Sequence, residues 1–279
     1  MKKLQVSEFI IKREGVTRDL PKGNESLRWV ASSATLIYSE DNAILIDTFT
    51  TIKQNNDLIE WIKTFNKKLT HIYITHGHGD HFYGIKQLTE AFPEAVALST
   101  RETAEHAIRE GNPEYIASFW GLLFPNQIPE PQVFPKPLVE DCFEFEGNKF
   151  EIIKTGFTDT NDTTALWIPN MKLVVAGDVV YNGIHQYMSE TTTESRINWI
   201  ESVNKLIALK PETVIANHKI PENSNSPKIL ENTKKYIEDF NSLDKTTNTT
   251  LELYNEMLKL YPNYANPGSL WGGSKKAKK

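Results

Sequence analysis

The 279-residue chain contains a single cysteine, Cys142. One cysteine excludes an intramolecular disulfide and any metal site built from several thiolates. A chain of this length buries enough surface to fold without such cross-links. Any bound metal must therefore be held by histidine and carboxylate side chains, and the lack of disulfides suits a reducing compartment.

The chain also lacks an excess of basic residues and long apolar runs. Its formal net charge is −5 and its only dense basic run is 275–279, so nucleic acid is not the expected partner. We expect this run to be a solvated, disordered tail. No run approaches the roughly 20 apolar residues of a membrane span, and the first residues lack the apolar stretch of a signal peptide. These features favour a cytoplasmic protein that acts on a small molecule and binds no membrane.

Apolar periodicity predicts a mixed α+β protein with layers of sheet and helix. Short β-branched and aromatic runs are typical of strands, and apolar residues at helical spacing indicate amphipathic helices. The predicted strands are 34–38, 43–47, 71–75, 143–145, 150–153, 165–168, 173–175 and 213–216. The predicted helices are 52–65, 83–92, 101–109, 195–209 and most of 227–260.

We expect one domain over residues 1–279, with a core of about 30–220, an insert of about 101–137 and a helical extension of about 227–271. Five prolines between 125 and 137 oppose regular structure, so the insert should lie on the scaffold rather than join its sheet. Phe119, Trp120 and Phe124 in the insert either form an apolar wall that binds substrate or only dock it onto the core. Tyr261–Trp271 is expected to be a docked tail rather than a site.

Three histidines and an aspartate follow the predicted strand 71–75 within six positions: His76, His78, Asp80 and His81. The strand fixes the base of this loop, and two intervening glycines let the backbone bend. Imidazole nitrogens and carboxylate oxygens are ligands that suit zinc or iron at about 2 Å. His76 and His78 can converge on one ion, which leaves Asp80 and His81 to point to a second. With only seven histidines in the chain, this clustering favours a metal-binding loop over a polar surface turn.

The pattern H-x-H-x-D-H after a strand resembles the signature of the metallo-β-lactamase superfamily. Three further segments extend the resemblance from about residue 30 to 220. Leu45–Thr48 is similar to the family's early strand that ends in an aspartate behind the metal loop. Val175–Asp178 is similar to the strand that ends in a carboxylate bridging two metals. Ala216–His218 is similar to the segment with the last metal-binding histidine, with Asn217 where glycine is commoner.

The resemblance implies a four-layer αβ/βα sandwich with the metals in a cleft at one edge of the two sheets. It implies a cofactor of one or two zinc ions, with iron or manganese as alternatives. The implied activity is hydrolysis, by a metal-bound hydroxide, of an ester, lactone, thioester, amide or related bond, with Asp80 also orienting the nucleophile and handling a proton. The ligands it implies are His76 and His78 for a first site, Asp80, His81 and His218 for a second, and Asp178 as a bridge.

One element departs from the family pattern. The family usually has another metal-binding histidine in a Gly-His-Thr or Gly-His-Ser context, whereas here Phe157 follows Gly156. Phenylalanine cannot bind a metal, so the first site loses a ligand and we expect two ions to be held unequally. Asp159, two residues along the same loop, is either the replacement ligand or an ordinary turn aspartate.

His185 follows the expected bridging aspartate closely. It either reaches the cleft, as a proton donor or substrate contact, or is an ordinary surface-loop histidine. Two alternatives to hydrolysis stay open, an iron-dependent redox enzyme of the same fold and a non-catalytic binding protein with a partly degenerate site. The redox alternative is disfavoured, because single-iron members depend on the histidine replaced by Phe157 and no flavin-binding domain follows. Without an export signal, we do not expect antibiotics to be the substrate.

Overall fold

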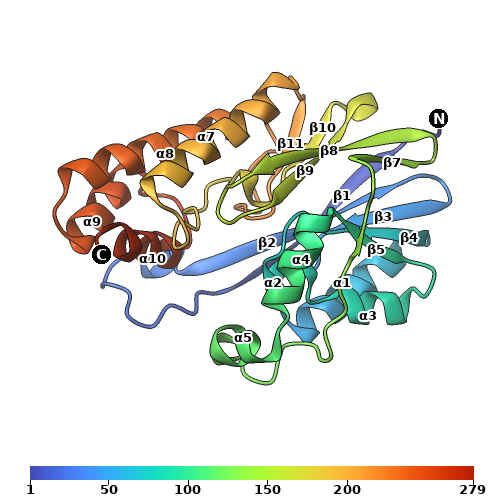
Figure 1. Ribbon diagram of the computed structural model, residues 1–279, viewed down its shortest axis with the longest axis horizontal. Helices are drawn as coiled ribbons and strands as arrows, with labels where there is room; N and C mark the ends of the chain where they lie inside the picture. Colours follow the sequence, from blue (N-terminus) through green and yellow to red (C-terminus); the bar gives the residue numbers. More distant parts are fainter.

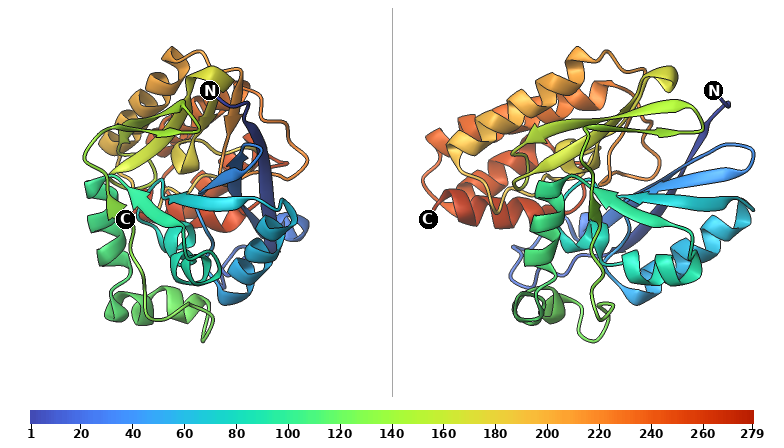
Figure 2. Two further views of the ribbon diagram at one scale, coloured as in Figure 1. Left: turned by 90° about the vertical axis from the view of Figure 1, so that its right-hand side faces the viewer. Right: turned by 45° about the vertical axis from the view of Figure 1, so that its right-hand side comes forward.

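Two β-sheets pack face to face between outer layers of helices in the computed structural model, which describes all residues from Met1 to Lys279 (Figure 1). The first sheet has the strand order β1-β2-β3-β4-β5-β6 and the second has the order β11-β10-β9-β8-β7. Figure 2 shows helices on the outer face of each sheet. The predicted mixed α+β class and four-layer αβ/βα sandwich are therefore confirmed.

The first sheet is antiparallel at its N-terminal edge and parallel elsewhere. The pairs β1/β2 and β2/β3 are antiparallel, whereas β3/β4, β4/β5 and β5/β6 are parallel. Parallel neighbours place the loops that follow them at one edge of the sheet. Its strands are β1 (Gln5–Glu14), β2 (Trp29–Tyr38), β3 (Asn42–Ile46), β4 (Lys68–Tyr73), β5 (Val96–Ser99) and β6 (Lys136–Pro137).

The second sheet is a meander closed by one parallel strand. Antiparallel pairing joins β7, β8, β9 and β10, and β11 adds parallel to β10. The ends of β10 and β11 therefore point to the same edge. The strands are β7 (Cys142–Phe145), β8 (Asn148–Gly156), β9 (Thr163–Ile168), β10 (Leu173–Val175) and β11 (Thr213–Ile215).

Strand alternation divides the core into three layers. Successive side chains of a strand point to opposite faces, so Ile44 and Ile46 of β3 face the second sheet while Leu45 faces the outer helices. The same division separates Leu166 of β9 from Trp167. Strands buried on both faces explain why the sequence shows continuous apolar runs rather than alternation.

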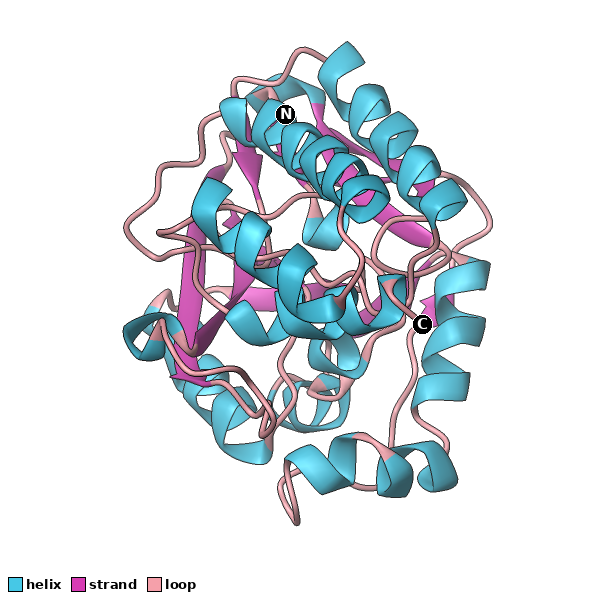
Figure 3. Cartoon of the chain, turned by 90° about the vertical axis from the view of Figure 1, so that its left-hand side faces the viewer, coloured by secondary structure: helices cyan, strands magenta, loops and turns pink.

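Helices cover both outer faces. The helices on the side of the first sheet are α1 (Ile52–Thr64), the short α2 (Gly79–Phe82) and α3 (Ile85–Ala91). The insert adds α4 (Arg101–Glu110), α5 (Pro113–Ser118) and α6 (Trp120–Leu123). The second sheet is covered by α7 (Thr193–Ala208), α8 (Lys228–Thr246), α9 (Thr250–Leu260) and α10 (Pro267–Ala277). The helices α8, α9 and α10 lie together at one end of the molecule (Figure 1), and Figure 3 views the molecule from that side. None of the helices combines the length and apolar character needed to cross a membrane.

The structure adds one element that was not predicted and corrects two expectations. The ten-residue strand β1 was not predicted, although it pairs with β2 along its whole length. The insert does join the sheet at its end, because Lys136 and Pro137 pair with β5 as a two-residue edge strand, a position where proline's missing N–H is tolerated. The basic run at the C-terminus is not a solvated, disordered tail. It continues α10, and Lys278 forms an ion pair with Asp244.

Arg196 connects two helices of the outer layer through a buried ion pair. It is 1% exposed on α7, and its Nη2 lies 2.6 Å from Asp244 Oδ2 on α8. Its Nε also donates to Asn241 Oδ1 at 2.5 Å. Replacing Arg196 removes this pair and the hydrogen bond to Asn241 from a buried position, and it leaves Asp244 with Lys278 as its remaining cationic partner. Losing buried polar contacts of this kind costs several kcal/mol.

We therefore expect Arg196→Met to lower the free energy of unfolding by about 3 kcal/mol. The matched control is Lys235→Met on α8, where the lysine pairs with Asp239 at the surface, and this change should cost less than about 1 kcal/mol. Chemical denaturation of both variants measures the difference. Equal losses in the two variants would contradict the role given to Arg196.

Candidate metal centre

The predicted metal loop and four other chain segments meet at one edge of the sandwich. In the first sheet, Asp47 follows β3 and the histidine loop follows β4. In the second sheet, Asp178 follows β10, His218 follows β11, and Asp159 lies in the loop between β8 and β9. The parallel pairs β3/β4 and β10/β11 explain why these segments converge, because each pair ends at the same edge of its sheet.

Asp47 holds the base of the histidine loop. Its Oδ1 accepts a hydrogen bond from the Thr75 amide at 2.8 Å, and its Oδ2 accepts one from Thr75 Oγ1 at 2.7 Å. The same Oδ2 lies 3.0 Å from His81 Nδ1. Asp47 has a left-handed backbone with φ of 62°, which aspartate tolerates better than most residues. The carboxylate lies behind the loop, as the resemblance predicts.

Asn217 connects this network to the second sheet. Its Oδ1 accepts from the Ser33 amide at 2.9 Å, and its Nδ2 lies 3.3 Å from Asp47 Oδ2 and 2.8 Å from His81 Nδ1. The asparagine therefore fixes the segment that carries His218 against the loop that carries His81. A glycine at this position would offer none of these side-chain contacts.

Two histidines have their ring orientation fixed by groups outside the centre. His218 Nδ1 donates to the Ala31 carbonyl at 2.9 Å, so its Nε2 is free to face Asp178 Oδ2 at 3.2 Å and Asp80 Oδ2 at 3.5 Å. His81 Nδ1 faces Asp47, and its Nε2 lies 3.6 Å from Asp178 Oδ1. A histidine whose other nitrogen is engaged in this way is the usual arrangement of a metal ligand.

Asp159 joins the first histidine pair. His76 Nε2 and His78 Nδ1 lie 3.2 Å apart. Asp159 Oδ2 lies 3.1 Å from His78 Nδ1 and 3.8 Å from His76 Nε2, and the side chain is fully buried. An ordinary turn aspartate would point to solvent, so the geometry favours the interpretation of Asp159 as a replacement ligand. Phe157 does not line the adjoining cavity.

These residues form three overlapping groups whose ligand atoms lie within 4.8 Å of one another. One group contains His76, His78 and Asp159, and another contains Asp80, His81 and His218. His76, His81 and Asp178 form a third group that connects the other two. The structure thus brings every metal-binding residue predicted from the sequence into one centre.

Unpartnered buried atoms indicate that the centre fits a cation. His81 Nε2, Asp159 Oδ2 and Asp178 Oδ1 are buried and make no hydrogen bond. Such atoms are rare in folded proteins, because each costs the free energy of its lost hydration. All three belong to the groups above, and all are donors of the type that divalent metal ions bind.

The pKa shifts reflect crowding of opposite charges. Burial alone would raise the pKa of Asp178, but the charges of His218 and His81 lower it well below its usual value. Burial raises the pKa of Asp159 and lowers that of His76. Against its own burial, His218 has its pKa raised to about 10 by Asp178 and Asp80. These opposite shifts show that the imidazoles and carboxylates of the centre stabilise one another's charged forms.

Two residues that contact the centre carried no signal in the sequence. Glu190 Oε1 lies 3.1 Å from His78 Nε2, which orients the Nδ1 of that ring toward Asp159. Tyr181 donates its hydroxyl to Asp178 Oδ2 at 2.9 Å. Glu190 is 112 residues from His78, and neither residue lies in a motif. Only the folded chain reveals these contacts.

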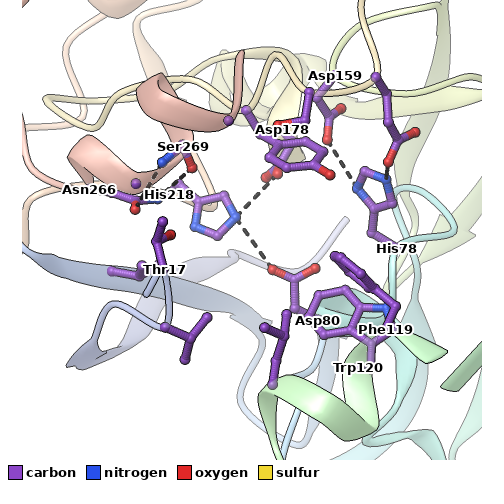
Figure 4. A pocket seen from close by; sticks show the side chains of 18 of the residues that line it. Thr17, His78, Asp80, Phe119, Trp120, Asp159, Asp178, His218, Asn266 and Ser269 are labelled. Atoms are coloured by element: carbon purple, nitrogen blue, oxygen red, sulfur yellow. Dashed lines mark hydrogen bonds and ion pairs between the residues drawn. The ribbon is translucent and has the colours of Figure 1, made fainter. Parts of the chain in front are cut away.

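The centre forms the floor of a cavity of about 470 Å³ (Figure 4). His78, Asp80, Asp159, Asp178 and His218 line it. Figure 4 shows Phe119 and Trp120 beside His78 and Asp80. The aromatic residues of the insert therefore face the metal centre rather than only dock onto the core, and those lining the cavity are Tyr115, Phe119, Trp120 and Phe124.

The structure does not bring His185 into the cavity. The residue is fully buried, its Nδ1 lies 2.9 Å from the Tyr236 hydroxyl, and its amide donates to the Ala265 carbonyl. Burial lowers its pKa to about 3. After Asp178 the chain turns into the C-terminal helical layer, so His185 lies neither in the cleft nor in a surface loop, and both alternatives expected from the sequence are wrong.

The C-terminal segment is also more than a docked tail. Asn266, Gly268, Ser269, Gly272 and Lys275 line the cavity from α10 and the turn before it. Figure 4 places Asn266 and Ser269 beside His218. Their small and polar side chains form the wall opposite the aromatic insert.

Comparison with known proteins identifies a matching family and several similar proteins. The family model described as the metallo-beta-lactamase superfamily matches residues 27–218. A type 2 metallo-beta-lactamase of Bacillus sp. (strain 170) is 23% identical over 216 residues, which cover 73% of this chain and 76% of the relative. A hydroxyacylglutathione hydrolase of Francisella philomiragia is 42% identical over only 76 residues, 27% of each chain. A solved metallo-beta-lactamase family protein from Thermus thermophilus matches with a TM-score of 0.65, 18% identity and coverage of 97% of this chain and 91% of that chain.

The placement of Asp159 generates a prediction about metal uptake. Asp159→Asn keeps the shape of the side chain but removes its charge, so zinc uptake by metal-free protein should weaken about tenfold to a hundredfold. Phe157→His should leave uptake unchanged, because position 157 does not line the cavity. Calorimetric titration of zinc into each metal-free variant measures both effects.

Asp162→Asn is the matched control, since it makes the same change in the same loop. Asp162 has a left-handed backbone conformation, which asparagine also tolerates. It should bind zinc like the parent protein. Tighter uptake by Phe157→His together with normal uptake by Asp159→Asn would show that the loop still presents position 157 to the metal.

Proposed function

The chain belongs to the metallo-β-lactamase superfamily, and from this premise we propose that it is a metal-dependent hydrolase of a small-molecule ester, lactone, thioester, amide or related bond. The observation that carries the proposal is the convergence of four imidazoles and three carboxylates in one centre, of which two imidazoles and all three carboxylates line one cavity. A structural metal site is closed, whereas this centre opens onto a space that fits a small molecule.

The donor set is suited to one or two zinc ions, with iron or manganese as alternatives. We assign His76, His78 and Asp159 to one ion and Asp80, His81 and His218 to another, with Asp178 between them. When bound, such ions activate water and polarise the oxygen of the bond to be cleaved. Asp47, Glu190 and the Ala31 carbonyl orient the imidazoles before any ion arrives.

We assign the handling of a proton to Asp80. Among the acidic residues of the centre it has the most accessible side chain, at 15% against 3% or less for Asp159 and Asp178. It lines the cavity, and its two oxygens lie 3.8 Å from His81 Nε2 and 3.5 Å from His218 Nε2. A carboxylate at this boundary can orient the attacking water, accept its proton and return it to the leaving group.

The walls of the cavity supply binding. Phe119, Trp120 and Phe124 offer an apolar surface for the non-reacting part of the substrate, and Trp120 is held in place because its Nε1 donates to Glu110. The names of the two sequence relatives, a metallo-beta-lactamase and a hydroxyacylglutathione hydrolase, refer to different substrates. A test of activity must therefore span several kinds of bond.

We expect zinc-loaded protein to hydrolyse at least one member of a panel of lactones, aryl esters, thioesters, phosphoesters and β-lactams. Removal of metal by a chelator should abolish turnover, and added zinc should restore it. His218→Ala should lose zinc and reduce kcat/KM at least about a hundredfold, because an imidazole ligand is removed. Elemental analysis and initial rates measure these effects.

His71→Ala is the matched control, since His71 lies in β4, partly buried and outside the cavity. It should keep both metal and activity. Fully metal-loaded protein that turns over no member of the panel would favour a non-catalytic binding protein. Iron as the bound metal, with oxygen consumption in place of hydrolysis, would favour the redox alternative.

A further inference from the structure

Arg13 is the feature of the cavity that metal binding does not explain. Two basic side chains line the cavity, Arg13 and Lys275. Lys275 pairs with Asp19 at 2.7 Å. Arg13 forms no ion pair with any carboxylate, and its only side-chain hydrogen bond is to the carbonyl of the adjacent Glu14 at 3.1 Å. The cavity therefore contains a guanidinium whose charge has no acidic partner.

The fold directs this side chain toward the cavity. Phe9, Ile11 and Arg13 alternate along β1 and so share one face of the strand, and Phe9 and Ile11 pack on the core beneath the insert. At the end of β1, the Arg13 guanidinium lies 4.9 Å from the ring centroid of Phe124. Stacking on an aromatic ring leaves the hydrogen-bonding edge of a guanidinium available for another group.

The acidic residues of the cavity are engaged elsewhere. Glu110 accepts a hydrogen bond from Trp120, and Glu190 faces His78 and Thr160. The Asp80 charge does act on Arg13, but Asp80 belongs to the proposed metal set. Once a cation neutralises the centre, the positive charge of Arg13 is left for a ligand.

We propose that Arg13 binds a carboxylate of the substrate, so that the hydrolase selects an anionic substrate with an apolar part. Guanidinium and carboxylate match in shape and form paired hydrogen bonds, and the aromatic wall at Phe119, Trp120 and Phe124 receives the apolar part. Arg13 precedes the segment 27–218 that the family model matches. This inference rests on the proposed hydrolase function, and it assigns a substrate-binding role to Arg13.

Two esters of equal chain length test the proposal: 4-nitrophenyl butyrate, which is neutral, and mono-4-nitrophenyl succinate, which carries a carboxylate. Zinc-loaded protein should prefer the succinate ester. Arg13→Gln should reduce kcat/KM for that ester about tenfold to a hundredfold, mainly through KM, as expected for a lost charged hydrogen bond. The butyrate rate should not change, and Arg13→Lys should retain part of the preference.

Arg18→Gln is the matched control, because it removes the same charge from an exposed side chain outside the cavity and should alter neither rate. Equal losses for both esters in Arg13→Gln would show that Arg13 only supports Phe124 and would overturn the proposal. An unchanged preference for the succinate ester in that variant would overturn it as well.

A binding measurement separates this inference from the proposed function. Zinc-loaded protein should bind phenylacetate more tightly than phenylacetamide in calorimetry, and Arg13→Gln should remove the difference. If the protein hydrolyses neither ester but shows this Arg13-dependent difference, the hydrolase proposal fails for esters and the anion site stands. If binding of phenylacetate is the same in both proteins, the anion site is rejected even where hydrolysis is observed.

Discussion

The buried Asp47 carboxylate is the constraint on which the arrangement of the centre depends. It fixes the base of the histidine loop through two hydrogen bonds to Thr75 and faces both His81 and Asn217. Through Asn217 it reaches the segment of the second sheet that carries His218. A buried carboxylate costs free energy unless its oxygens are satisfied. Here the groups that contact Asp47 belong to the segments that carry the proposed metal ligands. The stability of this network and the geometry of the proposed ligands are therefore coupled.

The two sheets contribute unequally to this alignment. The loop after β4 provides four donors in one short segment, whereas the second sheet provides Asp159, Asp178 and His218 from three separate strand ends. Besides the Asn217 contacts, the packing of the two sheets decides whether the two sets meet, and the shared core of Ile46, Phe150, Leu166 and Ile215 forms that packing. A change in this core would alter the metal centre without touching any ligand.

The sequence allowed prediction of those features that depend on a short run of residues. The histidine loop, the strand ends at Asp47 and Asp178, and the sandwich itself could be predicted, because each depends on a short run and its similarity to a family. Glu190 and Tyr181 could not, since their contacts depend on where a loop crosses the centre. His185 was misplaced for the opposite reason. Its closeness to Asp178 in the sequence suggested closeness in space, but the chain turns away from the centre and His185 packs against Tyr236 of α8.

The proposed metal donors and the cavity walls come from different parts of the chain, which explains why the substrate is harder to infer than the reaction. The metal donors lie at strand ends inside the segment 27–218 that the family model matches, where the core holds them. The cavity walls come partly from outside it, from Arg13 and Thr17 at one end of the chain and Asn266 to Lys275 at the other, and partly from the insert. Trp120 and Phe124 of the insert are also core residues, but none of these wall segments supplies a proposed metal donor, so they can vary while the donors stay in place. We therefore expect substrate preference to depend on the walls, and Arg13 is the wall residue whose charge has no acidic partner in the protein.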